Sequence, residues 1–265
     1  MIPAVTVLLP VHNGMPWLVE ALASVRAQTF GDVEVYAIDD RSDDGTTRLL
    51  MSHHDVGAVC MFRMTHRVGL TAALNHGLTY AHAPLIARLD ADDLMRPDRL
   101  AKQVAFMDAH PDVGLLGSAW IEKAPDGGVI RLRTPPLDDA GLRAMLIRRN
   151  PFAHSSVMFR ADLVRQVGGY DARYRVAQDY DLWMRLARVT RLACLPEVLT
   201  VRRILPTGVS ATSVRARRWA ETRIRLRAIA RGQYPVSALR YVVRPLIGSA
   251  LPPRIVKPRF IQEAA

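Results

Sequence analysis

In Ala87-Arg88-Leu89-Asp90-Ala91-Asp92-Asp93, an apolar run that begins at Pro84 ends in three carboxylates within four residues. An apolar run bounded by turn signals predicts a buried strand, and the aspartates, which are poor strand formers, are expected just past its carboxyl end. Three carboxylates there repel one another, and a divalent cation would relieve the repulsion. Mg²⁺ and Mn²⁺ suit such oxygen ligands and fill their other positions with water or phosphate oxygens. The structural alternative is that Asp92 or Asp93 caps the helix that follows Pro97.

Strand and helix alternate along the first part of the chain. Apolar runs predict strands at residues 4–10, 33–38, 58–62 and 84–90, and helical spacing predicts helices that begin near residues 16, 46, 69 and 97. The crossovers are long enough for parallel pairing, which predicts a Rossmann-like sheet with its ligands at the carboxyl ends of the strands. The first turn, residues 10–14, has no GxGxxG, and the chain has no P-loop motif, so dinucleotide-dependent enzymes and P-loop proteins are disfavoured.

After Pro111 the pattern changes. Residues 113–122 and 129–133 flank the turn Asp126-Gly127-Gly128 and predict a hairpin. Further helices are predicted over 137–148, before Gly168-Gly169 and over 179–189, with strands at 155–159 and 198–203. A chain of 265 residues fits one large domain with an appendage.

Three features bear on the surroundings of the chain. No run of 18 apolar residues occurs, so no transmembrane helix is expected. The segment Met1–Val5 lacks the basic and apolar regions of a signal peptide, which predicts a cytoplasmic location. Cys60 and Cys194 lack CxxC spacing and are expected to be reduced, buried and inert.

Acidic clusters recur along the chain: Asp39-Asp40 and Asp90–Asp93 each follow a strand, and Gln178-Asp179-Tyr180-Asp181 opens a helix. With their neighbours, these clusters resemble glycosyltransferase family 2, the inverting enzymes of the GT-A fold, over roughly residues 4–212. The segments that carry the resemblance are Pro10–Asn13, Ser24–Phe30, Asp39–Thr46, Gly69–Gly77, Asp90–Asp93 followed by Pro97–Leu100, Gly168–Asp171 and Gln178–Leu186. The resemblance implies an α/β GT-A catalytic domain over 1–212, with a mostly parallel sheet flanked by helices. Its nucleotide-sugar half would cover about 1–110 and its acceptor half 111–212.

The resemblance also implies transfer of a sugar from a UDP-, dTDP- or GDP-sugar to an acceptor hydroxyl. Asp90 and Asp92 would form the DxD motif that holds Mg²⁺ or Mn²⁺ on the donor diphosphate, with Asp93 assisting or substituting. The cation would neutralise charge on the leaving diphosphate. For Asp39-Asp40, placed by the resemblance at the nucleobase and ribose, the alternative is an Asx-turn with a cap for the helix at Thr46. The residues expected to contact the donor are Pro10, His12, Asn13, Asp39, Asp40, Asp90 and Arg202.

In this resemblance Asp179 is the general base, which must be ionised and within reach of the acceptor hydroxyl. The family usually carries Glu before this Asp, whereas this chain has Gln178. The alternative for Asp179 is an N-cap of the helix over 179–189. Asp181 is expected to be a solvated charge of the first turn. His154 and Trp183 are candidates for the acceptor side, against a packed structural His and a core Trp.

Residues 213–265 are predicted to form a basic helical extension. Residues 215–265 hold 12 Lys and Arg against 2 Asp and Glu, a net charge of +10 out of the chain's +11. Trp219, Leu226 and Ala230 form a narrow apolar stripe, and Leu239, Val242, Val243 and Leu246 follow at helical spacing. This composition suits peripheral binding to an anionic membrane surface. The alternative is that the stripe packs on the catalytic domain and the arginines are solvated; nucleic acid is disfavoured because no recognised motif occurs.

The sequence therefore predicts a metal-dependent inverting glycosyltransferase, cytoplasmic or peripheral on the inner face of the membrane. Its acceptor is expected to be a glycan or a lipid-linked molecule in cell-surface polysaccharide or lipid-linked glycan synthesis, which rests on the resemblance alone. One alternative, motivated by Gln178, is a catalytically degenerate protein that binds nucleotide sugar or membrane and regulates a partner. A sugar-nucleotide pyrophosphorylase is disfavoured because residues 10–14 are not a Gly-rich loop with Arg or Lys.

Overall fold

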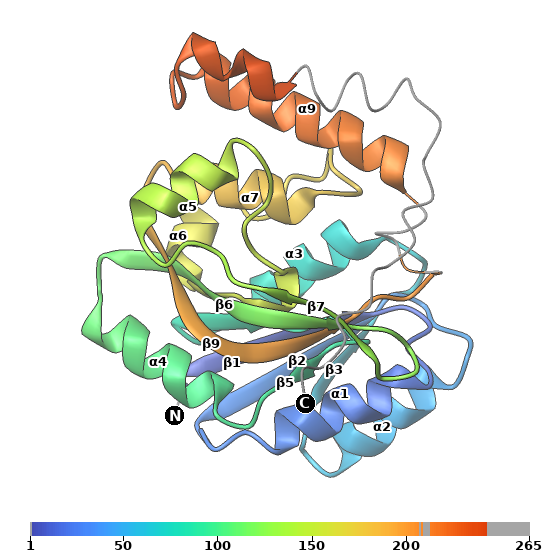
Figure 1. The fold of residues 1–265 in the computed structure, drawn as a ribbon. Helices are drawn as coiled ribbons and strands as arrows, with labels where there is room; N and C mark the ends of the chain where they lie inside the picture. Colours follow the sequence, from blue (N-terminus) through green and yellow to red (C-terminus); the bar gives the residue numbers. More distant parts are fainter. Residues whose placement is uncertain (1, 207, 209–212, 243–265) are drawn as a thin grey trace.

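The computed structural model describes residues 2–206, 208 and 213–242, which form one mixed sheet with helices on both faces (Figure 1). The strands are β1 (Val5–Val11), β2 (Val33–Asp39), β3 (Cys60–Arg63), β4 (Leu85–Arg88), β5 (Leu94–Met95), β6 (Val113–Lys123), β7 (Val129–Arg133), β8 (Met158–Arg160) and β9 (Arg191–Arg203). The α-helices are α1 (Trp17–Arg26), α2 (Thr46–Asp55), α3 (Leu70–Tyr80), α4 (Arg99–Ala109), α5 (Asp139–Leu146), α6 (Ala161–Gln166), α7 (Gln178–Leu186) and α9 (Val214–Ala230). The short 3-10 helices are η1 (His154–Ser156) and η2 (Val236–Leu239).

In the described residues the strand order is β3-β2-β1-β4-β8-β6-β9-β5, and β7 pairs with β6 outside this path. β1 is parallel to β2 on one side and to β4 on the other, and β3 is parallel to β2. This half of the sheet confirms the predicted alternation of parallel strands and helices. β8 is antiparallel to both β4 and β6, and β9 returns parallel to β6.

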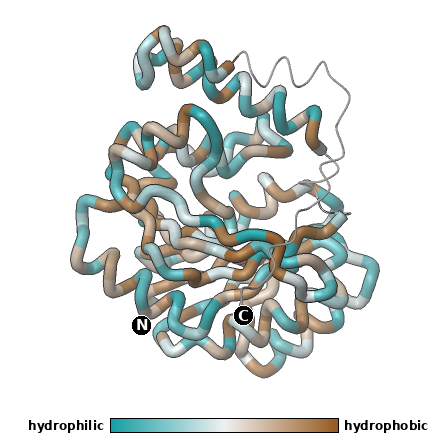
Figure 2. The backbone as a smooth tube through the Cα atoms, viewed as in Figure 1, coloured by the Kyte–Doolittle hydropathy of each residue, from teal (hydrophilic) through white to brown (hydrophobic). Residues whose placement is uncertain are grey.

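Two apolar cores lie on the two faces of the sheet. Side chains of successive strand residues point to opposite faces, and β1 divides accordingly: Leu8 belongs to one core, whereas Val7 and Leu9 belong to the other. The Leu8 core includes residues of α3, α5, α6 and α7, and the second core includes residues of α1 and α4. Figure 2 shows hydrophobic and hydrophilic residues alternating along these helices.

The second half of the chain confirms the predicted hairpin, because β6 and β7 pair antiparallel around residues 124–128. The prediction for the last strand was too short. β9 begins at Arg191 rather than at residue 198, and its pairing with β6 shifts register between Ser118 and Trp120. Pro196 and Glu197 break the apolar run in the sequence, so the first half of the strand gives no clear signal.

Helix α9 packs on α7 and forms an outer layer over α7 and α5 (Figure 1). On its buried face, Ala220, Ile224 and Ala228 join the core that contains Leu8. Arg225 is buried as well. The helix therefore packs on the domain, but not through the predicted stripe: Trp219 is 49% exposed and Leu226 41% exposed. Of the predicted second helix, the residues beyond Val242 lie outside the described part of the chain.

Two expectations about the surroundings have different outcomes. Within the described ranges, no helix combines the length and the apolar character that crossing a bilayer requires. Cys194 is buried, as expected, but Cys60 is exposed. The prediction for Cys60 was wrong because β3 ends the strand order, and a residue on an edge strand is covered on fewer sides.

Candidate active site

The carboxyl ends of β2 and β4 lie at the same edge of the sheet, on either side of β1. Asp39 ends β2, and Asp90, Asp92 and Asp93 follow β4 directly. One side-chain oxygen from each of these last three carboxylates lies within 4.8 Å of the others. The helix-cap alternative for Asp92 and Asp93 is wrong, because β5 intervenes and Asp98 is the residue that precedes α4.

Asp90 and Asp93 are held in different ways. Asp90 forms an ion pair with the fully buried Arg88, and its Oδ2 accepts a 3.0 Å hydrogen bond from Ser155 Oγ. Oδ1 of Asp93 accepts from the backbone N–H of Arg203 at 2.8 Å. The Arg203 side chain in turn donates to the carbonyl oxygen of Asp92 at 3.0 Å. The acidic loop is thus attached to β9 and to the segment before β8.

The charges of this loop are only partly compensated. Burial, followed by the charge of Asp90, raises the pKa of Asp92 to about 6, and the same causes raise the pKa of Asp93 well above its ordinary value. Burial is the largest influence on Asp90 and would raise its pKa, but the charges of Arg88 and His154 and the hydrogen bonds from Arg88 and Ser155 together lower that pKa. Crowded, partly buried carboxylate oxygens fit a hard divalent cation such as Mg²⁺ or Mn²⁺. Asp90, Asp92 and Asp93 are therefore the residues that could hold it.

The loops after β1 and β2 are joined to each other. His12 Nδ1 lies 2.9 Å from the carbonyl oxygen of Asp40, and Asn13 exchanges hydrogen bonds with Asp43 at 2.8 and 3.0 Å. His12 is partly exposed and Asn13 exposed, so both can reach a ligand at this edge. Pro10 lies inside β1 and is buried, so it belongs to the sheet rather than to the loop.

The side chains of Asp39 and Asp40 both accept hydrogen bonds from backbone N–H groups. Asp39 Oδ1 accepts from the Ser42 N–H at 2.9 Å, which closes the turn that the Asx alternative predicts. Asp40 accepts from the N–H groups of Val68 and Gly69 at 2.6 and 2.8 Å, which binds the start of α3 to the end of β2. The cap part of the alternative is wrong, because Gly45 precedes α2.

Asp179 lies in the first turn of α7, where the helix dipole favours a negative charge. It is partly exposed, and its Oδ2 accepts a 2.7 Å hydrogen bond from Asn150 Nδ2. Burial raises the pKa of Asp179, and the charge of Asp90 contributes in the same direction. The N-cap alternative is wrong: Ala177, with φ of 58°, precedes the helix. Gln178 is buried.

His154 and Trp183 contact each other, with 5.9 Å between the centres of their rings. His154 Nε2 is 2.8 Å from the Tyr170 hydroxyl oxygen, and burial, followed by the charge of Arg88, lowers the pKa of His154 well below its ordinary value. Trp183 is fully buried, with Phe152, His154 and Phe159 against its ring. The acceptor-side prediction for Trp183 was therefore wrong: α7 turns this residue into the core, where no sugar can stack on it.

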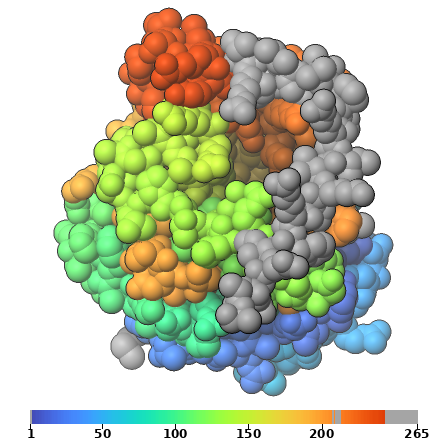
Figure 3. Space-filling model, in the orientation of Figure 1, coloured from blue at the N-terminus to red at the C-terminus, as the bar shows by residue number. Residues whose placement is uncertain are grey.

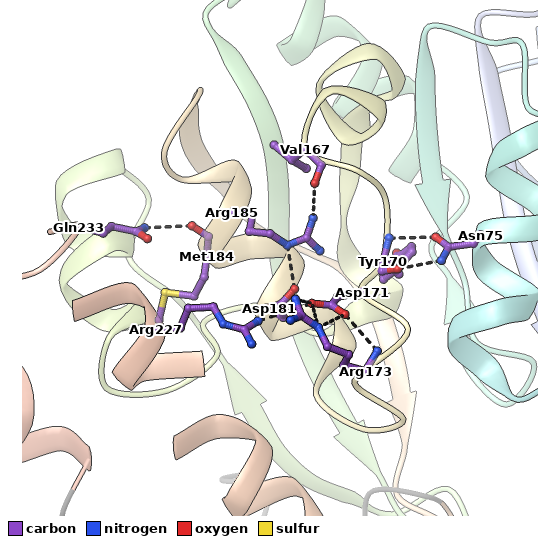
Figure 4. A network of polar contacts seen from close by, with 10 residues as sticks. All are labelled: Asn75, Val167, Tyr170, Asp171, Arg173, Asp181, Met184, Arg185, Arg227 and Gln233. Carbon is purple, nitrogen blue, oxygen red and sulfur yellow. Dashed lines mark hydrogen bonds and ion pairs between the residues drawn. The ribbon is translucent and has the colours of Figure 1, made fainter. Parts of the chain in front are cut away.

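Asp181 contradicts the expectation of a solvated charge. It is 3% exposed and accepts a 2.8 Å hydrogen bond from Arg185, one turn further along α7. Arg227 of α9 lies 3.9 Å from Asp181 and 3.5 Å from Asp171, as Figure 4 shows. Asp181 was misread because the local pairing with Arg185 was not recognised and because a second cation, Arg227, comes from a helix 46 residues away in the sequence.

Sequence reasoning missed several residues that build the site. It gave no role to Arg88, Ser155, Asn150 or Arg203, although each touches one of the acidic residues. A role for Arg88 could have been predicted, because it is a charged residue inside the apolar run that begins at Pro84. Arg202, expected at the donor, has one nitrogen 3.6 Å from Glu122 Oε1, and its charge acts on both Asp92 and Asp179.

The site and fold agree with a known family. A family model described as "Glycosyl transferase family 2" matches residues 6–168, more than half of the chain. The chain belongs to this family. EpsE of Bacillus subtilis (strain 168), named as a glycosyltransferase, is 34% identical to this glycosyltransferase over 188 residues, which are 69% of this chain and 66% of EpsE. AmsE of Erwinia amylovora, named as an amylovoran biosynthesis glycosyltransferase, is 32% identical over 184 residues, which are 69% of this chain and 68% of AmsE.

Solved structures confirm the GT-A fold of this glycosyltransferase. Residues 1–349 of S. aureus TarS, in complex with UDP-GlcNAc, align with a TM-score of 0.73 at 17% identity, covering 91% of this chain and 71% of that one. The mannosyltransferase PcManGT from Pyrobaculum calidifontis, in complex with GDP-Man and Mn²⁺, aligns with a TM-score of 0.68 at 23% identity, covering 95% and 71%. At this identity the likeness shows the fold alone. The chain spans about two thirds of the length of EpsE and AmsE.

Proposed function

We propose that this glycosyltransferase is metal-dependent and transfers a sugar, with inversion, from a nucleoside-diphosphate sugar to an acceptor hydroxyl. The observation that carries the proposal is that one short segment, residues 150–155, holds two acidic groups: Ser155 Oγ donates to Asp90 at 3.0 Å, and Asn150 Nδ2 donates to Asp179 at 2.7 Å. The cluster Asp90, Asp92 and Asp93 offers oxygen ligands within 4.8 Å of one another, and the charge of Asp90 reaches Asp179 at the start of α7. The first group suits a cation on a diphosphate, and the second suits proton removal.

Each residue has a defined part in the proposed reaction. Asp179 takes the proton from the acceptor hydroxyl as its oxygen attacks the anomeric carbon, and the bond from that carbon to the diphosphate oxygen breaks on the opposite face. Asn150 holds the Asp179 carboxylate through its 2.7 Å hydrogen bond. When bound by Asp90, Asp92 and Asp93, Mg²⁺ or Mn²⁺ supplies Lewis-acid neutralisation of the leaving diphosphate. His12, Asn13 and Arg202 face the donor.

The donor class is supported by the solved relatives, which hold UDP-GlcNAc and GDP-Man. We propose a UDP-, GDP- or dTDP-sugar as donor. We propose a glycan or lipid-linked acceptor in polysaccharide synthesis, because AmsE is named for amylovoran biosynthesis. In this proposal residues 1–212 are the catalytic domain, with the donor half over about 1–110 and the acceptor half over 111–212.

A donor panel tests the proposal. UDP-glucose, UDP-GlcNAc, GDP-mannose and dTDP-rhamnose are each added to the full chain with Mn²⁺ or with a chelator. We expect one donor to raise the melting temperature when Mn²⁺ is present and to release its nucleoside diphosphate. Binding without release over a broad acceptor panel would favour the degenerate regulatory alternative. If no donor raises the melting temperature, the result would count against both the glycosyltransferase proposal and the regulatory alternative.

The exposed face of the C-terminal helices supports a further part of the proposal, peripheral binding to an anionic membrane surface. Trp219, Leu226, Val236 and Leu239 are 49%, 41%, 72% and 40% exposed, within the segment that holds almost all of the net positive charge. Figure 3 shows η2 and the end of α9, in orange and red, projecting beyond the yellow-green surface around α5. Apolar side chains beside basic ones are what an interfacial helix presents to anionic lipid.

Vesicle co-sedimentation tests the membrane proposal. We expect the full chain to sediment with phosphatidylserine vesicles at low salt and to be released at high salt, because surface charges are screened. Trp219→Ala with Leu226→Ala should lower the recovery about tenfold, since both side chains lose apolar area that the lipid would bury. Val56→Ala, at an exposed apolar residue after α2, is the matched control. Equal recovery of the double variant and the control would reject the proposed face.

A further inference from the structure

Arg225 of α9 is a buried cation far from the acidic cluster in sequence. It is 1% exposed, and its Nε and Nη2 donate to the carbonyl oxygens of Ile147 and Arg148, each at 3.0 Å. Nη2 also lies 3.1 Å from Glu221 Oε2, one turn earlier on the same helix. Its guanidinium carbon lies 5.3 Å from the centre of the Tyr180 ring, in α7.

The contacts of Arg225 supply hydrogen-bond donors to carbonyl groups just after the end of α5. The last carbonyl groups of a helix lack partners within the helix, and a cation near them is favoured by the helix dipole. The Tyr180 hydroxyl donates to Leu146 O at 2.5 Å, so three successive carbonyls, those of residues 146–148, receive donors from α7 or α9. The backbone that leaves α5 is therefore fixed in position by two other helices.

That backbone leads directly to the residue that holds Asp179. Asn150 follows Arg148 by two positions, and its Oδ1 accepts from the Phe152 N–H at 3.1 Å. The other end of the same amide, Nδ2, donates to Asp179 Oδ2 at 2.7 Å. The amide is thus oriented on one side by the main chain and presents its N–H group to the carboxylate on the other.

We propose that Arg225 is a positioning residue for the reaction: it fixes the turn after α5, and through Asn150 it sets the orientation of the Asp179 carboxylate. The inference rests on the proposed function, in which Asp179 is the base. It makes α9 part of the catalytic apparatus instead of a separate appendage.

The hydrogen bonds of Arg225 come with a cost in stability. Among the described residues, its Nη1 has no hydrogen-bond partner, so the chain retains a buried cation with an uncompensated donor. Burying such a group is costly, and replacing a buried charge by a well-packed apolar side chain is often neutral or stabilising. A methionine would fill similar volume, but it would leave the carbonyls of residues 147 and 148 without their donors. The specific gain from arginine is the geometry of these two hydrogen bonds.

The test compares Arg225→Met, Asn150→Ala, the double variant and Arg223→Met, with turnover measured as nucleoside-diphosphate release from the best donor of the panel. Arg223 is exposed on the same helix and serves as the matched control. We expect Arg225→Met to lower kcat by about 10- to 100-fold, the cost of a small misplacement of a reacting group. The KM for the donor should stay within about twofold, because donor contacts are unchanged. Arg223→Met should match the wild type.

Two readouts separate positioning from a merely structural role. If Arg225 acts through Asn150, the double variant is no slower than Asn150→Ala, because effects through a shared partner do not add. The acid limb of the pH profile should also move to higher pH in both single variants, since the carboxylate loses a donor that stabilises its charged form. Additive effects in the double variant, or a wild-type kcat for Arg225→Met, would overturn the proposal.

Two further variants test whether the substituted protein folds and whether Asp179 is the base. Arg225→Lys keeps the charge but cannot donate to both carbonyls in the same fork geometry, so it should give an intermediate kcat with a near-native melting temperature. If Arg225→Met fails to fold, a wild-type kcat and pH profile for the lysine variant would overturn the inference. Asp179→Asn is measured beside them. Full turnover by that variant means that the base assignment fails, whereas an inactive Asp179→Asn with unaffected Arg225 and Asn150 variants means that only the positioning role fails.

Discussion

We expect Asp179→Asn to lower kcat by about 10²- to 10⁴-fold, the range that a general base contributes. The amide has nearly the shape of the carboxylate but cannot take the acceptor proton. In the proposed reaction Asp179 stands on the acceptor side of the reacting carbon, so the KM for the donor should change by less than about threefold. The measurement is nucleoside-diphosphate release under saturating donor and Mn²⁺.

The control for this substitution is Asp162→Asn, which removes an exposed carboxylate from the first turn of α6. It should leave kcat and KM at wild-type values. A kcat for Asp179→Asn close to that of the control would mean that another group, or solvent, accepts the proton. The melting temperature of both variants is measured so that a loss of folded protein is not read as a loss of catalysis.

We expect the same carboxylate to set the pH dependence of turnover. Burial, with a contribution from Asp90, raises the pKa of Asp179, while Asn150 and Arg202 act in the opposite direction. Only the ionised form accepts a proton, so activity is full above the pKa of Asp179 and is lost as the pH falls through it. The acid limb of the profile should therefore lie above the ordinary carboxyl pKa of about 4. In Asp179→Asn this limb should disappear from the residual activity.

Much of the first half of the fold, from β1 to α4, could be predicted from the sequence. Apolar runs at β1, β2 and β4 each end in polar residues, and the helices between them are long enough to force parallel pairing. Since parallel strands share a carboxyl edge, Asp39 and the Asp90–Asp93 loop had to lie at one side of the sheet. The site at that edge follows from periodicity alone. What periodicity could not give is the role of each carboxylate there.

The missing information lies in contacts between distant segments. Arg88 and Asp90 are neighbours in sequence, but the Ser155 hydroxyl that completes their arrangement is 65 residues away. Asn150 meets Asp179 across 29 residues. No local pattern predicts such pairs, because each depends on how β4, η1 and α7 are placed relative to one another.

The prediction of which face of α9 is buried was wrong for a related reason. A hydropathy argument assigns Trp219 and Leu226 to the buried face and the arginines to solvent. In the structure Arg225 is buried instead, because it donates to two carbonyl groups at the end of α5. Leaving buried carbonyls without donors costs more free energy than one further apolar contact would supply. Small residues, such as Ala220 and Ala228, allow α9 to approach closely enough for the arginine to reach them.

We also expect Asp92→Ala to remove most turnover, by roughly 10³-fold, since a Lewis acid on the leaving group is worth several kcal/mol. Asp92 is the best of the three carboxylates to change. Asp90 is tied to Arg88 and Ser155, and Asp93 to the backbone of Arg203, so their loss would also disturb the loop. Asp92 is partly exposed, and burial together with the charge of Asp90 raises its pKa to about 6. Its removal should take away a proposed metal ligand with the least effect on the fold.

The readout for Asp92→Ala includes metal binding as well as activity. Mn²⁺ affinity, followed by titration in the presence of UDP or GDP, should fall at least tenfold, because one of the three carboxylates proposed to hold the cation is lost. Asp98→Ala is the control, since Asp98 is an exposed carboxylate just before α4 that pairs with Lys102. Chelation of the wild type should reproduce the Asp92→Ala result, and added Mn²⁺ should restore the wild type but not the variant. Full turnover in chelator would reject the metal-dependent mechanism while leaving the expectation for Asp179 intact, because proton removal by that carboxylate does not require the cation.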